Sequence, residues 1–256
     1  MVKRMMIIIG VVAVVLIFLF VLMNQGPPDP TALTSEELGA LRVAVHNDLA
    51  KMGDRQYMDQ PLEGFEVDLS GQLAQKIYGD EKLLDLKAST GRTALVMLDN
   101  KDVDCVVATQ VAPEKSEAYL YSDAYYTDEV KVLYKNGSPA NVGSFGADQK
   151  IGVLSNSPAA AMLEKAKSDS KSQVKIVLLE SYPDAQDFLE QGKIDAFCGG
   201  QIFLQDFEGT QSFELGTCEY SIVLRKDDTK LLEEINKALG SLRESGQLNQ
   251  LKDRWK

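Results

Sequence analysis

The chain has 256 residues, of which 45% are hydrophobic and 25% charged, enough for two core-forming lobes of an ordinary globular protein. Its net charge of −11 at pH 7 repels phosphate backbones, so nucleic-acid binding is not expected. With one histidine and three cysteines, and no CxxC spacing, we expect no metal site, no disulfide framework and no histidine-based catalytic triad.

The N-terminal segment is predicted to lie in a membrane. Lys3 and Arg4 precede an uncharged apolar run over residues 5–23. At about 1.5 Å per helical residue, this run matches a bilayer core of about 30 Å. A signal peptide has a shorter apolar region, of about 7–15 residues, and a small-residue cleavage site, which the following NQGPPDP lacks. An uncleaved helix is therefore favoured, with a cleaved signal as the alternative.

The two basic residues before this run set its expected orientation. Positive charge stays on the cytoplasmic side, so the remainder of the chain would lie outside the cell. We expect a single-pass cell-membrane protein with an anchor over residues 1–24, a Pro-rich tether over residues 25–40 and an extracytoplasmic C-terminal binding domain.

Beyond the tether, short apolar runs alternate with amphipathic stretches. Strands are predicted over residues 41–45, 84–87, 103–108, 130–134, 151–155, 174–179, 194–200 and 220–224. One helix is predicted to begin at Leu69 with Asp68 as its N-cap, and others lie over residues 93–98, 158–166, 183–191 and 229–255, the last with a break at Gly246. This alternation is typical of an α/β fold with largely parallel sheets.

Three blocks of sequence carry a resemblance to a known family. They are LEGFEVDLSGQLAQKIYG, then GRTALVMLDNKDVDCVVATQVAPEKSEAYLYSDAYY, and the final YSIVLRKDDTKLLEEINKALGSLRESGQLNQLKDRW. Residues 41–256 resemble the extracytoplasmic solute-binding proteins of polar amino-acid ABC importers (solute-binding family 3). Within that family the chain looks most like the aspartate, glutamate and glutamine binders.

The resemblance implies a two-lobed periplasmic-binding-protein-like fold (type II). The chain would leave lobe 1 (residues 41–130 and 221–256), build lobe 2 (residues 131–220) and return through a second hinge strand. A small-molecule ligand would lie between the lobes. The implied partner is an ABC permease in the membrane, and we expect a monomer without a cofactor.

Candidate ligand residues in the first lobe follow from the same resemblance. Arg92 is expected to receive the ligand's side-chain carboxylate, because a planar guanidinium suits a bidentate grip; the alternative is a solvated arginine near a helix start. In the loop ATQVAPEK, Thr109 can donate a hydroxyl and Gln110 an amide. Lys115 stands where relatives have an arginine, as a point charge for the α-carboxylate or as a solvated lysine at a helix start.

The second lobe departs from the family pattern. Ser157 before Pro158 fits a helix N-cap, whose amides could also bind the α-carboxylate. Relatives read near V-D-A-F-x-x-D, and their final Asp pairs with the ligand ammonium. That position is Gly200 here, so Asp48 is the candidate substitute acid. Tyr125 is a further cleft candidate, although packing in the core is favoured for it.

Three functions compete. The first is a tethered receptor that delivers a carboxylate-bearing solute, an acidic or polar amino acid or a related acid, for import. The second is a degenerate or sensor-type protein on the same fold, favoured by the altered clamp positions. An enzyme is the third and least favoured, because no paired acids converge on a recognisable site. A disulfide between Cys198 and Cys218 is left open.

Overall fold

The computed structural model describes residues 34–55, 57, 59–91, 93–137, 139–155, 157–204, 207 and 210–255. The predicted membrane segment over residues 5–23 and the side chain of Arg92 therefore lie outside the described residues. Within the described ranges, no helix is both long enough and apolar enough to cross a membrane.

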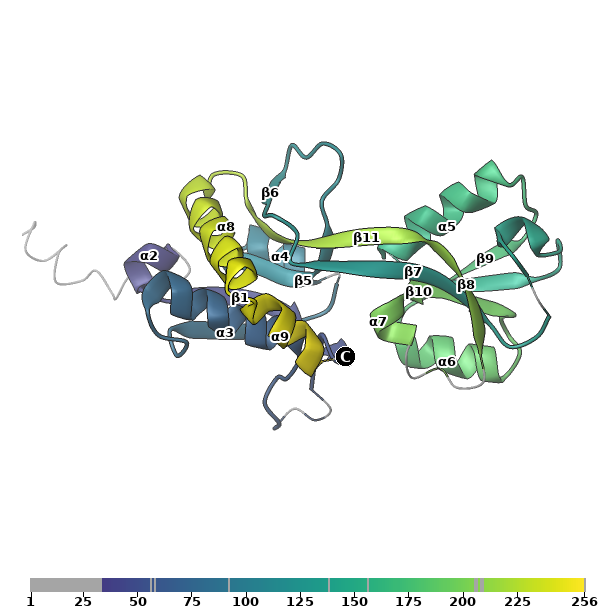
Figure 1. Cartoon of the computed structure of the whole chain (residues 1–256), viewed down its shortest axis with the longest axis horizontal. Helices are drawn as coiled ribbons and strands as arrows, with labels where there is room; N and C mark the ends of the chain where they lie inside the picture. The colour runs from purple at the N-terminus through teal and green to yellow at the C-terminus, as the bar shows by residue number, and fades with distance from the viewer. Residues whose placement is uncertain are drawn as a thin grey trace, which may run out of the picture.

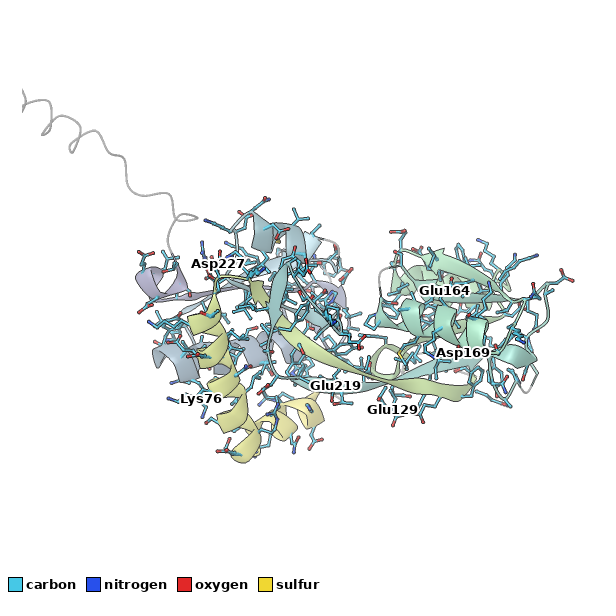
Figure 2. All side chains as sticks on the ribbon, turned by 90° about the horizontal axis from the view of Figure 1, so that it is seen from above. Lys76, Glu129, Glu164, Asp169, Glu219 and Asp227 are labelled. Carbon is cyan, nitrogen blue, oxygen red and sulfur yellow. The ribbon has the colours of Figure 1, made fainter. Side chains whose placement is uncertain are left out.

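Two lobes are joined by two long strands (Figure 1). These strands, β7 (Tyr126–Tyr134) and β11 (Gln211–Arg225), run antiparallel and pair from Tyr126↔Tyr220 to Tyr134↔Gln211. They lie in the middle of a sheet of order β4-β1-β5-β11-β7-β10-β8-β9, with β6 (Tyr119–Tyr121) paired to β11. Because both lobes share this sheet, β7 and β11 form the connection on which the lobes can move relative to each other. Figure 2 shows the same connection from above, with Glu129 and Glu219 on it.

Lobe 1 is built around a fully buried central strand. The strand β1 (Leu41–His46) lies between β4 (Leu84–Ser89) and β5 (Cys105–Val111), parallel to both. Its helices are α3 (Phe65–Tyr78), α4 (Thr93–Asp99), α8 (Thr229–Glu244) and α9 (Gln247–Arg254). A short α2 (Ser35–Leu38) precedes β1, and a small ribbon of β2 (Asp48–Leu49) and β3 (Gly53–Asp54) follows it. The parallel arrangement puts the C-terminal ends of β1, β4 and β5 at one edge of the sheet, where ligand sites of α/β folds are found.

Lobe 2 repeats this plan on a smaller scale. The strand β8 (Lys150–Leu154) lies between β9 (Lys175–Leu179) and β10 (Ala196–Gly200), again in parallel, and β10 pairs antiparallel with β7. Its helices are α5 (Pro158–Asp169), α6 (Tyr182–Glu190) and α7 (Gln201–Leu204), with a single 3-10 turn at Val142–Ser144. The two-lobed α/β architecture confirms the expected fold class, and the predicted strands and helices are present. The sheet is mixed, however, and not largely parallel as predicted, because β7 and β11 pair antiparallel with their neighbours.

The start of α3 corrects one prediction. This helix begins at Phe65, not Leu69, with Gly64 as its N-cap residue at φ 138°. A Cβ at Gly64 would lie 2.3 Å from the carbonyl oxygen of Met52, so only glycine allows this approach. Asp68 lies inside the first turn and accepts hydrogen bonds at 2.8 Å from Arg254 Nη1 and from Trp255 Nε1. Its carboxylate therefore fixes the end of the chain to α3 and does not cap the helix.

The cysteines settle the question of a bridge. Cys105, Cys198 and Cys218 are all buried free thiols. Cys198 on β10 and Cys218 on β11 lie on opposite sides of β7, where they pair with Val132 and Asp128. The two strands are separated by two strand spacings of about 4.8 Å each. This separation exceeds roughly 7 Å, the largest distance between Cα atoms that a disulfide can bridge.

Candidate functional site

A cavity of about 1070 Å³ opens between the lobes. Lobe 1 contributes the residues that follow β1, β4 and β5, and lobe 2 contributes the first turn of α5, the start of α6 and Phe203 of α7. The hinge strand β11 supplies residues 217–221 as a floor. Polar groups therefore face this cavity from both lobes, as an interlobe ligand site requires.

Half of the residues predicted from the sequence line this cavity, namely Asp48, Thr109, Gln110 and Ser157. Arg92 is not described, but Thr90 and Gly91, the two residues before it, are part of the lining. Lys115 is exposed in the loop between β5 and β6, away from the lining, and this loop contains no helix in its described residues. Lys115 is therefore exposed, as the alternative of a solvated lysine predicted, but it does not lie at the start of a helix. Its role as a ligand residue stays a prediction.

Thr109 has a strained backbone at the edge of the cavity. Its φ of 46° lies in the left-handed region, which is unfavourable for a β-branched residue. Its backbone N donates to Glu66 Oε1 at 2.9 Å and lies 3.0 Å from the Tyr125 hydroxyl, and its own hydroxyl lies 3.0 Å from His46 Nε2. Three other segments thus hold Thr109 in one orientation.

Behind Thr109 lies a carboxylate with no exposed surface. Glu66 of α3 accepts hydrogen bonds from the Tyr125 hydroxyl at 3.0 Å and from the His46 backbone N at 3.4 Å, besides that of Thr109. Burial raises the pKa of Glu66, while the charge of His46 and these hydrogen bonds lower it. The charged form of Glu66 therefore depends on its partners remaining in place.

His46 is the second titratable member of this group. Burial alone would lower its pKa, but the hydrogen bond to Asp48 and the charges of Glu66 and Asp48 raise it. Its Nδ1 lies 3.1 Å from Asp48 Oδ1, so the imidazolium can donate to both Asp48 and Thr109. Asp48, the candidate partner for a ligand ammonium, is already paired with a side chain of its own lobe.

The first turn of α5 forms much of the opposite wall. Ser157 Oγ accepts from Ala160 N at 3.3 Å and donates to Leu154 O at 2.8 Å, and Pro158 occupies the first helical turn. This geometry confirms Ser157 as the N-cap. Its proton is committed to Leu154, Pro158 has no N–H, and the Ala160 N–H is held by the cap, so Ala159 carries the amide of these three residues that remains for a ligand.

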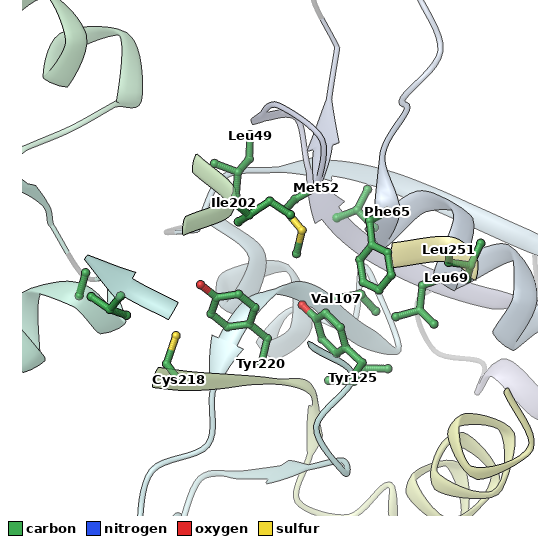
Figure 3. Close-up of a cluster of buried hydrophobic side chains, with 14 of the residues drawn as sticks. Leu49, Met52, Phe65, Leu69, Val107, Tyr125, Ile202, Cys218, Tyr220 and Leu251 are labelled. Atoms are coloured by element: carbon green, nitrogen blue, oxygen red, sulfur yellow. The ribbon is translucent and has the colours of Figure 1, made fainter. Parts of the chain in front are cut away.

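Aromatic rings fill the floor of the site. Tyr125 is fully buried, 6.0 Å from Phe65 and 6.4 Å from Tyr220 between ring centroids, as Figure 3 allows the reader to follow. Tyr126 stacks on Tyr220 at 6.1 Å. Of these rings only Tyr220 is part of the cavity lining. Tyr125 therefore packs in the core, and its hydroxyl reaches the site by hydrogen bonds with Glu66 and with the Thr109 backbone N.

Gly200 ends β10 as a buried residue that does not line the cavity. The space beside it is filled by Asp128 of β7, whose Oδ2 lies 2.0 Å from the position that a Cβ at Gly200 would take. Sequence reasoning missed Asp128, and it missed His46 and Glu66 as well. A signal for Asp128 was available, because strand alternation places it on the same face as Val130 and Val132.

No group of three or more metal-ligating side chains comes together within the described ranges. Two lobes of α/β structure around a polar cavity, joined by two antiparallel strands, define the periplasmic-binding-protein class of fold. The family model for bacterial extracellular solute-binding proteins, family 3, matches residues 41–256, and the chain belongs to this family. The resemblance noted in the sequence is thereby confirmed.

Relatives and solved structures agree with this assignment. The ABC transporter glutamine-binding protein GlnH of Bacillus subtilis is 28% identical over 220 residues, covering 82% of this chain and 79% of the relative. The glutamine-binding protein of Geobacillus stearothermophilus is 29% identical over 160 residues, covering 62% and 60%. An ancestral arginine-binding protein bound to arginine superposes with a TM-score of 0.72 at 23% identity, covering 85% of this chain and 98% of that one. This last likeness concerns the fold alone.

Proposed function

We propose that the chain is a membrane-tethered extracytoplasmic receptor that closes its two lobes over a small carboxylate-bearing solute and delivers it to an ABC permease. An acidic or polar amino acid is the favoured solute. The observation that carries the proposal is the cavity of about 1070 Å³ between lobes joined by β7 and β11. Curated relatives are named as glutamine-, arginine- and cystine-binding proteins, which supports a polar amino acid.

The two walls offer different partners for such a solute. Arg92 follows two cavity-lining residues of lobe 1 and would receive a carboxylate from that side. The Ala159 N–H and the positive end of the α5 dipole would receive a second carboxylate from lobe 2, because a helix N-terminus favours an anion. Contacts to both lobes at once exist only when the lobes close, so binding stabilises the closed form.

The remaining predictions belong to the same proposal. They are the anchor over residues 1–24, the tether over residues 25–40, the lobe boundaries at residues 130 and 220, a monomer, and a cell-membrane location with the binding part outside. Protease added to intact cells should remove the C-terminal part and spare an epitope placed at the N-terminus. Protection of the whole chain would contradict this orientation.

Ligand binding is tested on the full-length chain in detergent with a panel of Asp, Glu, Gln, Lys, Arg and small dicarboxylic acids. We expect Asp, Glu or Gln to bind in calorimetry and to raise the melting temperature, since a ligand at 100 times its Kd stabilises by about 2.7 kcal/mol. Arg92→Ala should weaken binding by at least about tenfold. Arg254→Ala, which removes an arginine paired with Asp68 and outside the cavity lining, is the matched control. Tight binding of Lys or Arg alone would overturn the choice of ligand.

A sensor-type or degenerate protein is the second candidate. It is favoured by two observations, the glycine at position 200 and the place of Lys115 outside the cavity lining. This reading predicts that no member of the panel shifts the melting temperature and that no permease copurifies with the full-length chain. Saturable binding of one amino acid, together with a copurifying permease, would exclude it.

A further inference from the structure

Asp128 is a buried carboxylate at the centre of the hinge. It lies on β7 opposite Cys218 of β11 and is only 3% exposed. Its Oδ2 accepts a hydrogen bond from the Tyr220 hydroxyl at 3.0 Å, and its Oδ1 accepts one from Ile202 N at 3.3 Å. The carboxylate thus joins both hinge strands to the start of α7.

Within the part of the chain that the structure describes, Asp128 has no cationic side chain as a partner. Among the ion pairs of the described residues, none includes it. The titratable groups facing it are three phenols and one thiol, all with raised pKa values and therefore neutral at pH 7: Tyr126, Tyr182, Tyr220 and Cys218. Burial raises the pKa of Asp128 to about 6. A buried negative charge without a positive partner is costly, so its retention points to a partner that arrives from outside the chain.

Gly200 leaves the room that this carboxylate occupies. A Cβ there would lie 2.0 Å from Asp128 Oδ2 and 3.1 Å from the Tyr220 hydroxyl, so any side chain would displace one of them. Position 200 and Asp128 are therefore alternatives for the same space. The acid that the sequence lacks on β10 is supplied from β7.

Tyr220 connects this charge with the cavity. Its hydroxyl gives its proton to Asp128 and is also hydrogen-bonded with the Cys218 thiol, so the phenolic oxygen has one acceptor position left. Tyr220 lines the cavity while Asp128 does not. A donor that reaches the Tyr220 oxygen from the cavity would be held by a hydrogen bond whose strength is raised by the carboxylate behind it.

We infer that Asp128 is the positioning residue for the ligand's ammonium group: acting through the Tyr220 hydroxyl, its negative charge selects amino acids over acids that lack the amine. This inference rests on the proposed function, because it specifies how the same cavity distinguishes its solute. Asp48, the acid that the sequence suggested for this role, is paired with His46. The closed lobes exclude water from this pair and strengthen it.

The test compares an amino acid with its deaminated counterpart on the full-length chain in detergent. The probes are glutamate against glutarate, and glutamine against glutaramate. Asp128→Asn keeps the size of the side chain and an acceptor for Tyr220 but removes the charge. We expect the wild-type preference for the amino acid to fall by at least about tenfold in this variant, while the affinity for the deaminated acid changes little.

Variants at Gly200 distinguish a role of the Asp128 charge from a purely structural role of Asp128. Gly200→Asp alone should unfold more easily because its side chain collides with Asp128. Asp128→Ala combined with Gly200→Asp moves the carboxylate to the other strand and should restore the preference for the amine. A merely structural role for Asp128 would not be rescued in this way.

The outcomes separate the two proposals. If the wild-type chain binds none of the four probes and no member of the wider panel, the proposed function falls and this inference falls with it. If it binds an amino acid and Asp128→Asn keeps the same preference over the deaminated acid, only the inference is overturned. Equal loss of both probes in Asp128→Asn, with no rescue by the double variant, also overturns it, because the role would then be structural.

Discussion

The two walls of the cavity are built on different principles. The lobe 1 wall is a network of charged groups in which Glu66, His46 and Asp48 hold Thr109 in a strained conformation. The lobe 2 wall combines a helix cap, Ser157, with apolar and aromatic side chains such as Met162 and Phe203 and with one carboxylate, Glu180. A network of charged groups fixed in one lobe can orient a solute before closure, while a wall with more apolar groups closes over it at a lower cost in desolvation.

Removing the centre of the lobe 1 network should give the largest effect on stability. Glu66→Ala leaves the His46 charge and the donors of Thr109 and Tyr125 without their acceptor in a buried place. Loss of one member of a buried charged group costs about 3–5 kcal/mol, and we expect that loss in the free energy of unfolding by urea. Glu66→Gln keeps an acceptor oxygen and should lose much less. Equal losses in the two variants would show that the negative charge of Glu66, which both variants remove, matters more than the acceptor oxygen that Gln keeps.

Removing the charge of the hinge carboxylate, Asp128, should stabilise the protein, whereas removing Glu66 should destabilise it. Because the pKa of Asp128 rises from 3.8 to about 6 on folding, its protonated form is favoured in the folded state. Its contribution to stability is fully present below pH 3.8 and is lost as the pH rises through about 6. Asp128→Asn should therefore be more stable than the wild type at pH 8, by up to about 3 kcal/mol.

The same comparison of unfolding free energies should show no difference below pH 3.8, where both states of Asp128 carry the proton. Asp123→Asn, which changes an exposed aspartate in the loop before β7, is the control and should differ from the wild type by less than about 0.5 kcal/mol. An Asp128→Asn variant that is less stable than the wild type at pH 8 would mean that the hydrogen bonds of Asp128 outweigh its uncompensated charge.

The contrast between the walls also explains which residues could be predicted from sequence. Thr109, Asp48 and Ser157 each follow a buried strand or open a helix, so local pattern places them at the cavity edge. Glu66 lies in a helix whose pattern also accommodates an exposed acid. Its burial depends on His46, Thr109 and Tyr125, which come from three other segments, and no local pattern encodes such a meeting.

The fold was more predictable than the site for the same reason. Strand and helix alternation is local, and it gave the α/β class and the order of elements. The start of α3 was misplaced because Asp68 resembles a cap, while the decisive contact is the approach of Gly64 to the Met52 carbonyl, twelve positions earlier in the chain. Asp128 was missed because its meaning depends on the empty space at Gly200 on another strand.

The lobe 2 wall should respond more weakly to mutation. Ser157→Ala removes the side-chain acceptor of Ala160 N, and loss of an N-cap typically costs about 1 kcal/mol. The matched control is Ser181→Ala, since Ser181 caps α6 in the same way by accepting from Asp184 N at 3.2 Å. Urea unfolding should give similar losses for both. A loss at Ser157 as large as that of Glu66→Ala would remove the distinction between the two walls.

The smallest effect is expected at Lys115, which tests how far the charged wall extends. Its side chain is exposed in the loop after β5 and does not line the cavity. Exposed charges at a distance are screened by salt, so Lys115→Ala should weaken binding of glutamate or glutamine by no more than about threefold in calorimetry, and less at high ionic strength. Arg92→Ala, measured on the same ligand, provides the scale. If Lys115→Ala matched the loss at Arg92, the loop after β5 would have to move onto the ligand during closure, and the lobe 1 wall would be partly assembled by binding instead of being fixed beforehand.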